Sequence, residues 1–570
     1  MKIEKVEISK FRSIDNGSFH LNKVNAIVGQ NNSGKSALMR ALNSFFNPQL
    51  ELEYYNNGTN LYTSKRSVPR ITITFTSIPN KTIYNPFLKN GKIVLTQEYN
   101  KKTKKLIYFA ENNGKITISE QQIFEIFEDI QFVLIPTERN AKNNTENEIS
   151  VLRRLLDTFF SIHTAKRDTL TPKVKQAFSY FKKNALSKVS FGIENKYLSE
   201  KGLKISIDSR YPLSYDLFVN DLSIKIIEDG KEFKLEECGS GIQSLVSISI
   251  YKYLAELNHT NFIIGIEEPE INLHPQAQKE LIFSFIEESN TNNVQIIFTT
   301  HSTVLIDQLE HSDIILVRKE NDIKRKFKTT IHQISSNFWQ QYNIEIIQYD
   351  KFHKFRNSEF FFANHVMVTE SSIDSEVFRT LLANKGIVLE KKGVSVLELG
   401  GIKSLKYAFY LLRDLKIPKT IIIDKDFFFN YQNGNKDTSR YGNGFFNYEK
   451  TYKNEPLINI IFNDPVKRDL IESLLTSNHS RALDETLKFD ILCMNFNLEM
   501  DLVASNTAKQ LIYDKLNIPL ANRNSYEILV NNEKRLKKIS TLIHVINNLP
   551  QANLPNSYKR LIRRFREVTR

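Results

Sequence analysis

The chain has 570 residues, more than one hydrophobic core usually supports, so we expect two to four domains. Its 41% hydrophobic and 25% charged residues are typical of a folded protein and exclude a disordered or fibrous chain. Two cysteines, Cys238 and Cys493, exclude a disulfide framework and a four-thiolate zinc site. No apolar run approaches the ~20 residues of a membrane span and Met1–Lys5 lacks a signal-peptide core, so we expect a cytoplasmic protein without membrane association. The net charge of +14 favours a polyanionic partner, nucleic acid first.

Four regions are predicted in chain order. Short apolar runs between turn-forming residues predict a strand-rich segment with one early helix over residues 1–145. Over residues 146–202 apolar side chains recur at helical spacing, which predicts an inserted helical element. Strand-like runs resume over residues 203–350 and again over residues 356–570, where two of them end in acids. Strands that alternate with helices predict an α/β fold with a parallel sheet.

A phosphate-binding loop is predicted between the apolar run Val24–Val28 and the helical segment Ala37–Phe46. Its sequence is Gly29-Gln30-Asn31-Asn32-Ser33-Gly34-Lys35-Ser36. Glycines let backbone N–H groups wrap the phosphates of ATP, and the helix N-terminus adds a favourable dipole. In such a loop Lys35 reaches the β and γ phosphates and Ser36 ligates Mg²⁺. The residues that we expect to contact the nucleotide are Gly29, Asn32, Ser33, Gly34, Lys35 and Ser36.

A buried strand that ends in two carboxylates supplies the rest of an ATPase site. Phe262–Ile266 leads into Glu267, which we expect to support Mg²⁺, and Glu268, which we expect to be the base for hydrolysis. The next strand, Ile296–Thr299, is followed by His301. A lone histidine is more often structural, but this position suits a γ-phosphate sensor.

A second glycine- and serine-containing loop, Glu237–Ser244, precedes an amphipathic stretch and forms another possible anion cradle. The order of phosphate loop, signature-like loop, acidic strand and histidine resembles the ATP-binding cassette (ABC) ATPases. The opening Ile8–Ile14 and the run Glu268–Pro275 are similar to the branch with chromosome-maintenance and DNA-repair ATPases. There the signature loop of one subunit caps ATP on another, which implies a homodimer or higher oligomer through the ATPase half. The capping residues implied here are Ser240, Gly241 and Gln243.

Acids also end two apolar runs near the C-terminus. His365–Thr369 leads into Glu370, and Ile421–Ile423 leads into Asp424 and Asp426. Acids at the carboxyl ends of parallel strands converge at one edge of a sheet. Clustered carboxylates repel one another unless a divalent cation is bound, so Mg²⁺ or Mn²⁺ is predicted. Two unrelated acidic loops are the alternative, which the intervening strand-like run Leu397–Gly401 disfavours.

This pattern resembles the Toprim fold of topoisomerases, primases and nucleases. A cassette ATPase followed by a Toprim domain resembles the OLD-family nucleases, the group that contains the Gabija nuclease subunit. The resemblance implies a helical dimerisation insertion in the ATPase, and a C-terminal Toprim domain with two metals. The acids that it implies for the metal site are Glu370, its companion Asp374, the pair Asp424 and Asp426, and the downstream Glu499 and Asp501. It also implies a catalytic lysine, matched best by Lys538 and next by Lys537.

Together these features predict an ATP-binding, metal-dependent DNA endonuclease. Two metals would activate water and stabilise the leaving 3′ oxygen, and Lys538 would offset the charge of the transition state. The basic runs Lys101–Lys105 and Lys559–Arg570 are candidates for the DNA path. The family resemblance implies bacterial anti-phage defence, with a second component such as a helicase-like protein or a reverse transcriptase with its non-coding RNA. Whether ATP activates or inhibits cleavage, and whether it is hydrolysed, stays open.

The competing prediction is an ABC ATPase that binds nucleic acid or a partner through a catalytically inactive Toprim domain. Ser371 favours it, because the family has a glycine after the first acid. The retained acids and lysine argue against it, since a purely binding surface has no use for acids facing a phosphate backbone. A repair ATPase with a structural clamp is disfavoured because the sequence has no long heptad coiled coil.

Overall fold

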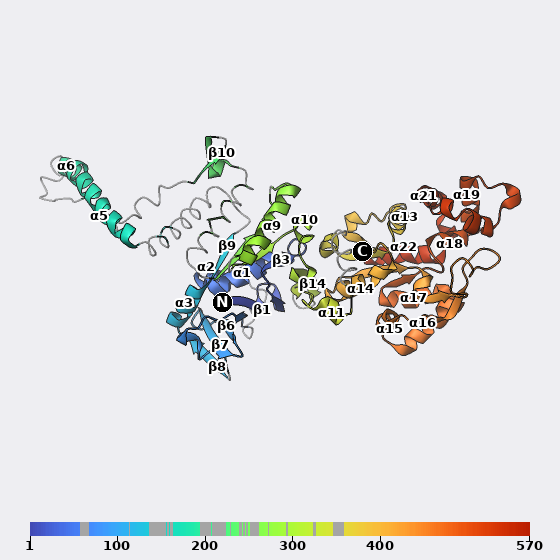
Figure 1. Ribbon diagram of the computed structural model, residues 1–570, viewed down its shortest axis with the longest axis horizontal. Coiled ribbons are helices and arrows are strands. Elements are labelled where there is room, and N and C mark those ends of the chain that lie inside the picture. Colours follow the sequence, from blue (N-terminus) through green and yellow to red (C-terminus); the bar gives the residue numbers. More distant parts are fainter. Residues whose placement is uncertain are drawn as a thin grey trace. The chain divides into compact units, whose positions relative to one another are not determined.

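The computed structural model contains two compact units, each described here by itself (Figure 1). The first comprises Met1–Ile27, Gly34–Leu305 and Glu320–Thr330, and the second comprises Val28–Ser33, Ile306–Lys319 and Ile331–Arg570. The residues that the structure describes are 1–56, 68–112, 114–135, 156, 159, 164–193, 207, 224–228, 230–238, 242, 246, 249–250, 253, 261–271, 273–291, 294–322, 326–345 and 358–569.

The first unit begins with antiparallel strands in the order β8-β7-β6-β4-β1-β2. Burial alternates along β4, where Ile71, Ile73 and Phe75 are buried, so one face of this strand is covered, whereas five consecutive residues of β6, Leu95–Tyr99, are buried. The bounds are β1 (Lys2–Phe11), β2 (Ile14–His20), β4 (Arg70–Thr76), β5 (Leu88–Lys89), β6 (Lys92–Asn100), β7 (Lys105–Glu111) and β8 (Lys115–Ile118).

The same sheet continues with parallel strands in the order β3-β13-β12-β9. Every residue of β3 and β13 is buried, and strands buried on both faces form the continuous apolar runs that the sequence shows. β14 and β15 stand between β3 and β2 in the strand order. The bounds are β3 (Val24–Val28), β9 (Ile130–Ile135), β12 (Asn261–Glu267), β13 (Val294–Thr299), β14 (Ile314–Asp322) and β15 (Lys326–His332).

Within the predicted insertion the structure describes two helices, α5 and α6. Helix α5 begins at Thr164, and Pro172 lies inside it. A π-helical turn, Lys182–Leu186, joins it to the next helix. The helices of this part of the chain are α1 (Lys35–Phe46), α2 (Pro48–Asn56), α3 (Glu120–Asp129), α5 (Thr164–Phe181), α6 (Ser187–Ile193), α9 (Pro275–Thr291) and α10 (Thr303–Ile306), with the hairpin β10 (Lys225–Glu228) and β11 (Lys231–Lys234).

The second unit contains a four-stranded parallel sheet in the order β17-β16-β18-β21. β16, β18 and β21 are buried throughout, so helices and loops cover both faces. Because all four strands run the same way, their carboxyl ends meet at one edge. The bounds are β16 (His365–Thr369), β17 (Val394–Glu398), β18 (Lys419–Ile423) and β21 (Ile491–Cys493).

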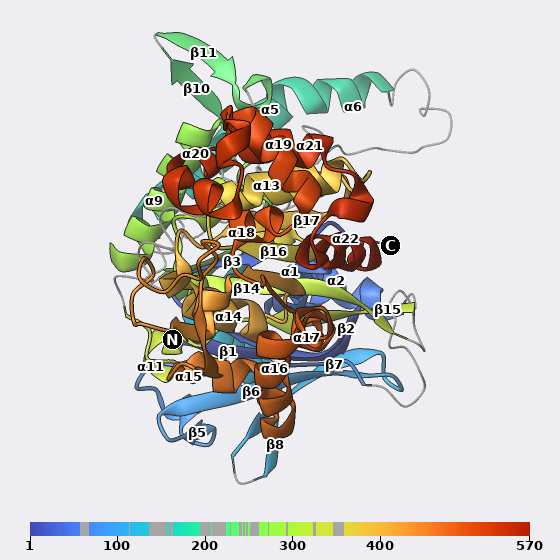
Figure 2. The ribbon, with the colours of Figure 1, turned by 90° about the vertical axis from the view of Figure 1, so that its right-hand side faces the viewer.

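An antiparallel hairpin and a series of helices complete this unit. Helices α13 and α21 lie side by side (Figure 2). The hairpin strands are β19 (Phe429–Tyr431) and β20 (Tyr448–Tyr452). The helices are α11 (Phe338–Gln341), α13 (Ser372–Ala383), α14 (Leu405–Asp414), α15 (Pro456–Ile461), α16 (Pro465–Ser477), α17 (His479–Thr486), α18 (Leu498–Val503), α19 (Asn506–Leu516), α20 (Glu533–Leu536), α21 (Ile539–Asn548) and α22 (Asn556–Val568). In the part of the chain that the structure describes, no helix is both long and apolar enough to span a membrane.

Candidate functional site

The predicted phosphate loop forms the turn between β3 and α1. Gly29 and Gly34 have φ angles of 149° and 112°, a backbone region that favours glycine. A Cβ on Gly29 would lie 2.1 Å from Val317 O, and one on Gly34 would lie 2.6 Å from Thr329 Oγ1. Helix α1 has no side-chain cap, and the first N–H groups of a helix have no partner within it. This closely packed glycine loop before an uncapped helix fits the phosphates of a nucleotide.

Titratable side chains that follow β12 and β13 lie near Lys35, which is at the start of α1. Lys35 is only 7% exposed, and burial lowers the pKa of its ammonium group to about 8, against the opposite effect of Glu268 and Glu270. His301 Nε2 lies 3.8 Å from Glu268 Oε1. Burial lowers the pKa of His301, and Lys35 lowers it further. The structure therefore brings Lys35, Glu268 and His301 together, as the sequence predicts.

The end of β12 is fixed against β13. Glu267 is buried and pairs in register with Thr299, and Glu268 N donates to Thr299 O at 3.0 Å. Glu270 Oε1 accepts a hydrogen bond from His301 N at 2.7 Å, whereas Glu270 Oε2 is buried with no hydrogen-bond partner. Such an orphaned oxygen fits a bound ligand or its water.

The other residues predicted to contact the nucleotide belong to the phosphate loop, to the first turn of α1 and to the second glycine-containing loop. Asn32 has a φ of 57° and Ser33 N donates to Gln30 O at 3.2 Å, which closes the turn before Gly34. Ser36 follows Lys35 in the first turn of α1. The predicted capping residues Ser240, Gly241 and Gln243 lie outside the described residues and stay a prediction.

Five carboxyl groups gather at the carboxyl edge of the parallel sheet in the second unit. Glu370 directly follows β16 and Asp424 directly follows β18, its neighbour in the sheet. Burial raises the pKa of Glu370 to about 7, and Asp426 and Asp374 contribute. Burial also raises the pKa of Asp424 well above its usual range, and four carboxylates raise it further: Asp374, Asp426, Glu370 and Glu499.

Ser371 and Asp374 cap helix α13 reciprocally. Ser371 N and Oγ donate to Asp374 Oδ2 at 3.0 and 2.9 Å, and Asp374 N donates to Ser371 Oγ at 3.3 Å. This is a capping box, which satisfies N–H groups of the first helical turn. The side chain that replaces the glycine expected after Glu370 is therefore engaged in starting α13.

The donor set fits a hard divalent cation. Carboxylate oxygens are the ligands that Mg²⁺ and Mn²⁺ prefer, and a cation relieves the repulsion among these acids. Among the described residues, no three His, Cys, Asp or Glu side chains stand close enough together to hold an ion as they are. The mutual influence of the acids on their pKa values nonetheless assigns Asp424, Glu370, Asp374, Asp426 and Glu499 to one cluster.

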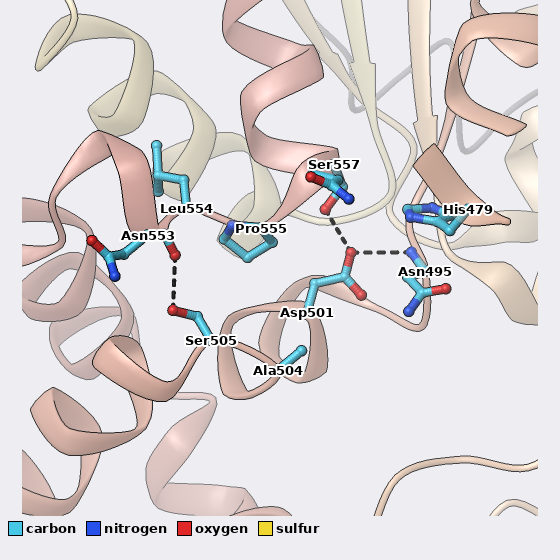
Figure 3. A pocket seen from close by; sticks show the side chains of 10 residues that line it. His479, Asn495, Asp501, Ala504, Ser505, Asn553, Leu554, Pro555 and Ser557 are labelled. Atoms are coloured by element: carbon cyan, nitrogen blue, oxygen red, sulfur yellow. Dashed lines mark hydrogen bonds between the residues drawn. The ribbon is translucent and has the colours of Figure 1, made fainter. Parts of the chain in front are cut away.

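Asp501 has different surroundings, although it is two residues from Glu499 on α18. Its carboxylate accepts hydrogen bonds from Asn495 N at 3.0 Å and Ser557 Oγ at 2.6 Å (Figure 3). It accepts a third from Phe496 N at 2.9 Å. Asp501 is 2% exposed and lies beside a pocket of about 330 Å³ that His479 also lines. The structure thus engages Asp501 in holding the loop before α18 and does not group it with the five acids.

The two candidate lysines differ in position. Lys537 Nζ donates to Glu533 Oε1 at 2.8 Å, and Glu499 is among the groups that raise the pKa of Lys537. Lys538 is exposed and is the N-cap of α21. Of the two, the structure brings Lys537 toward the carboxylate cluster.

The basic tail lies at the other end of the sheet. Arg564 on α22 pairs with Asp490 at 2.8 Å, and its Nε donates to Thr420 Oγ1 at 3.1 Å, near the amino end of β18. Arg560 pairs with Asp484 at 2.8 Å. These contacts place the second half of α22 at the amino ends of the strands, away from the acids. In the other predicted run, residues 101–104 form an exposed turn between β6 and β7, and Lys105 is the exposed first residue of β7.

Two residues near the acids were not found from the sequence, Tyr431 and Lys453. Tyr431 OH donates to Asp426 Oδ2 at 3.0 Å, and Lys453 Nζ donates to Asp426 O at 2.9 Å. Both come from the hairpin, in which Phe429 pairs with Tyr452. Tyr448, Thr451 and Tyr452 are residue types that favour strands and could have indicated β20, but its pairing with β19 is set by the folded chain.

Family models match both units' sequences. Residues 1–129 and 89–306 match the AAA ATPase domain, and residues 361–426 match the TOPRIM domain of proteins like the overcoming lysogenization defect (OLD) protein. The Old nuclease of Escherichia phage P2 is 23% identical over 463 residues, which cover 75% of this chain and 78% of that protein. The OLD nuclease of Thermus scotoductus is 24% identical, covering 48% and 50%, and Endonuclease GajA of Bacillus cereus is 28% identical, covering 41% and 39%. The chain therefore belongs to the AAA ATPase domain family, and after that domain it carries a segment that matches the TOPRIM domain of OLD-like proteins.

Proposed function

We propose that this protein is an ATP-binding, divalent-metal-dependent DNA endonuclease. The observation that carries the proposal is the group of five acids at the carboxyl edge of the parallel sheet, where Glu370 and Asp424 follow adjacent strands. The relatives' names, nuclease and endonuclease, support the same reaction class. The net charge of +14 suits a DNA substrate.

In the proposed reaction Glu370, Asp424 and Asp426 hold Mg²⁺ or Mn²⁺, with Glu499 available for a second ion. When bound, the metal supplies an activated water and stabilisation of the leaving 3′ oxygen. Tyr431 OH holds one oxygen of Asp426 and so orients that carboxylate. Lys537 or Lys538 is the lysine that offsets the charge of the transition state.

ATP would act mainly as a conformational ligand of the first unit. Lys35 binds the β and γ phosphates, Ser36 and Glu267 hold Mg²⁺, and Glu268 and His301 face the γ phosphate. A ligand shifts a conformational equilibrium only by the difference between its affinities for the two states. We further propose assembly through the ATPase half, with Ser240, Gly241 and Gln243 capping a partner's nucleotide, and a role in anti-phage defence with a second component.

The test is DNA cleavage by Asp424→Ala against wild type, with Asp469→Ala as the control. Asp469 is an acid of the same unit that is exposed, at 77%. Cleavage of plasmid DNA is measured with Mg²⁺ or Mn²⁺, with and without ATP, and Asp469→Ala should match wild type under each condition. Asp424→Ala should lose at least ~10²-fold in rate, because metal-assisted charge stabilisation contributes several kcal/mol. Without metal its melting temperature should hold or rise, because a buried, repelled carboxyl group is removed.

Cleavage by Asp424→Ala at the wild-type rate would refute the assignment of the site. Failure of the wild type to cleave under any nucleotide condition would favour the binding protein with an inactive Toprim domain. Ser371 was the sequence feature in favour of that alternative, and its hydroxyl is occupied in capping α13.

A further inference from the structure

The hairpin β19–β20 returns the chain to the acidic turn that follows β18. Lys453, the residue after β20, is fixed there at both ends. Its backbone N donates to Phe428 O at 2.9 Å, and its Nζ donates to Asp426 O at 2.9 Å. Nζ also lies 5.3 Å from the centre of the Phe427 ring. The side chain is therefore held against the turn that carries Asp424 and Asp426.

The ammonium group of Lys453 faces the carboxylate cluster. Glu370 follows β16, which neighbours β18 in the sheet, so this turn and Glu370 lie at the same edge of the sheet. In the turn, Lys453 Nζ donates one hydrogen bond to a backbone carbonyl oxygen. A carbonyl group is neutral, so this bond does not compensate the positive charge of the ammonium group. An ammonium group has three donors, so two are available to an anion that enters the site.

The other lysines nearby are engaged differently. Lys537 pairs with Glu533 at 2.8 Å. Lys425 is buried at 9% exposure, with Nζ between 5.6 and 5.9 Å from the centres of the rings of Phe429, Tyr448 and Phe496. Lys453 combines a fixed stem with a half-buried ammonium group beside the acids.

We propose that Lys453 contacts the scissile phosphate, donating to a non-bridging oxygen of the DNA backbone at the carboxylate cluster. This inference rests on the proposed nuclease function. Five clustered acids repel a phosphodiester, and a cation fixed at the rim of the cluster offsets that repulsion. It also stabilises the additional negative charge of the transition state, at no cost of reorganisation because its stem is already held.

The experiment compares Lys453→Met, which keeps length and removes charge, with Lys453→Arg and with the control Lys450→Met. Lys450 is an exposed lysine on β20 itself. Cleavage of plasmid DNA is measured over a titration of Mg²⁺. Affinity for a short duplex is measured by fluorescence anisotropy with Ca²⁺ in place of Mg²⁺, and melting temperature is measured without metal.

We expect Lys453→Met to lower the maximal cleavage rate by about 10²-fold or more. The Mg²⁺ concentration at half-maximal rate should not rise, and duplex affinity with Ca²⁺ should fall. The melting temperature without metal should fall slightly, because the cation that offsets the repulsion among the acids is removed. Lys453→Arg should recover part of the rate, since it retains the charge without the same geometry. Lys450→Met should match wild type in every measurement.

Two results would overturn the inference while leaving the nuclease intact. Wild-type cleavage by Lys453→Met shows that the residue is not needed. A raised half-maximal Mg²⁺ concentration, with the rate restored by excess Mg²⁺, shows that Lys453 only positions Asp426. Failure of wild type to cleave instead refutes the proposed function, and this inference with it.

Discussion

Glu499 and Asp501 stand two residues apart in the first turn of α18 and have different partners. Glu499 adds to the repulsion that raises the pKa of Asp424, whereas Asp501 accepts three hydrogen bonds from Asn495, Phe496 and Ser557. A carboxylate surrounded by donors stabilises the fold, and one surrounded by carboxylates destabilises it in the absence of a cation.

Replacement of these two acids should therefore have opposite effects on stability. Asp501→Ala leaves one buried donor, Ser557 Oγ, and two half-buried backbone N–H groups without an acceptor, so the free energy of unfolding should fall by about 1–3 kcal/mol. Glu499→Ala should leave it unchanged or raise it. Urea denaturation without metal measures both, and equal destabilisation by the two variants would contradict the separation of their roles.

His365 makes the second unit sensitive to acid. It is 5% exposed, and burial, Arg564 and Lys419 lower its pKa to about 4 from 6.5. The unfolded chain then binds this proton more tightly than the folded one. The contribution of His365 to the free energy of unfolding is therefore complete above pH 6.5. It is lost as the pH falls from 6.5 toward 4, by about 3 kcal/mol in total.

His365→Gln should flatten this part of the stability profile, measured by urea denaturation between pH 4 and 7.5. His544→Gln, on α21, is the control and should keep the wild-type slope. An unchanged slope in His365→Gln would assign the acid sensitivity to other groups.

At the scale of elements, the phosphate loop depends on close packing at Gly34. Gly34→Ala would place a methyl group 2.6 Å from Thr329 Oγ1 at a φ of 112°. Gly91→Ala also imposes a positive φ, 73°, but has nothing within 4 Å. Both variants carry the backbone strain of about 1 kcal/mol, and only Gly34→Ala adds the steric clash.

Gly34→Ala should thus lower the melting temperature more than Gly91→Ala and should lose the rise that ATP produces in wild type. Gly91→Ala should retain that rise in full. Differential scanning fluorimetry with and without ATP measures both quantities. An ATP-dependent rise that persists in Gly34→Ala would show that the loop tolerates a side chain.

The sequence predicted the strands that carry both sites because buried parallel strands are continuous apolar runs. Val24–Val28 is β3 in full, and His365–Thr369 is β16 in full. It could not separate Glu499 from Asp501, since their roles depend on which of them meets the loop before α18 and Ser557 of α22. It also did not find Lys453, whose position depends on the pairing of β19 with β20. Contacts between distant segments decide both cases, and no local pattern encodes them.

At the scale of the whole molecule, the two ligand sites should be separable. A ligand at 100 times its dissociation constant stabilises the folded state by about 2.7 kcal/mol, provided that its site is intact. Lys35→Ala should lose the stabilisation by ATP and keep that by Mn²⁺. Asp424→Ala should lose the stabilisation by Mn²⁺ and keep that by ATP.

Thermal melts of wild type and the two variants, each with no ligand, ATP in EDTA, or Mn²⁺ alone, give the required comparison. EDTA removes the metal that ATP would otherwise carry into either site. A variant that loses both responses would indicate that one site cannot form without the other.

Because the chain is synthesised from its N-terminus, α22 is made after the segments that carry the five acids, and it holds one of those segments in place. All five clustered acids are synthesised before α22, yet α18, which carries Glu499, is held by that helix. Ser557 Oγ donates to Asp501 Oδ2 at 2.6 Å, and Tyr558 OH donates to Leu498 O at 2.9 Å. A nascent chain that has not yet released α22 lacks the contacts that fix α18. Glu499 therefore reaches its place beside the other four acids only after α22 has been synthesised and has packed against α18, so the carboxylate cluster is completed by a segment that carries none of its acids.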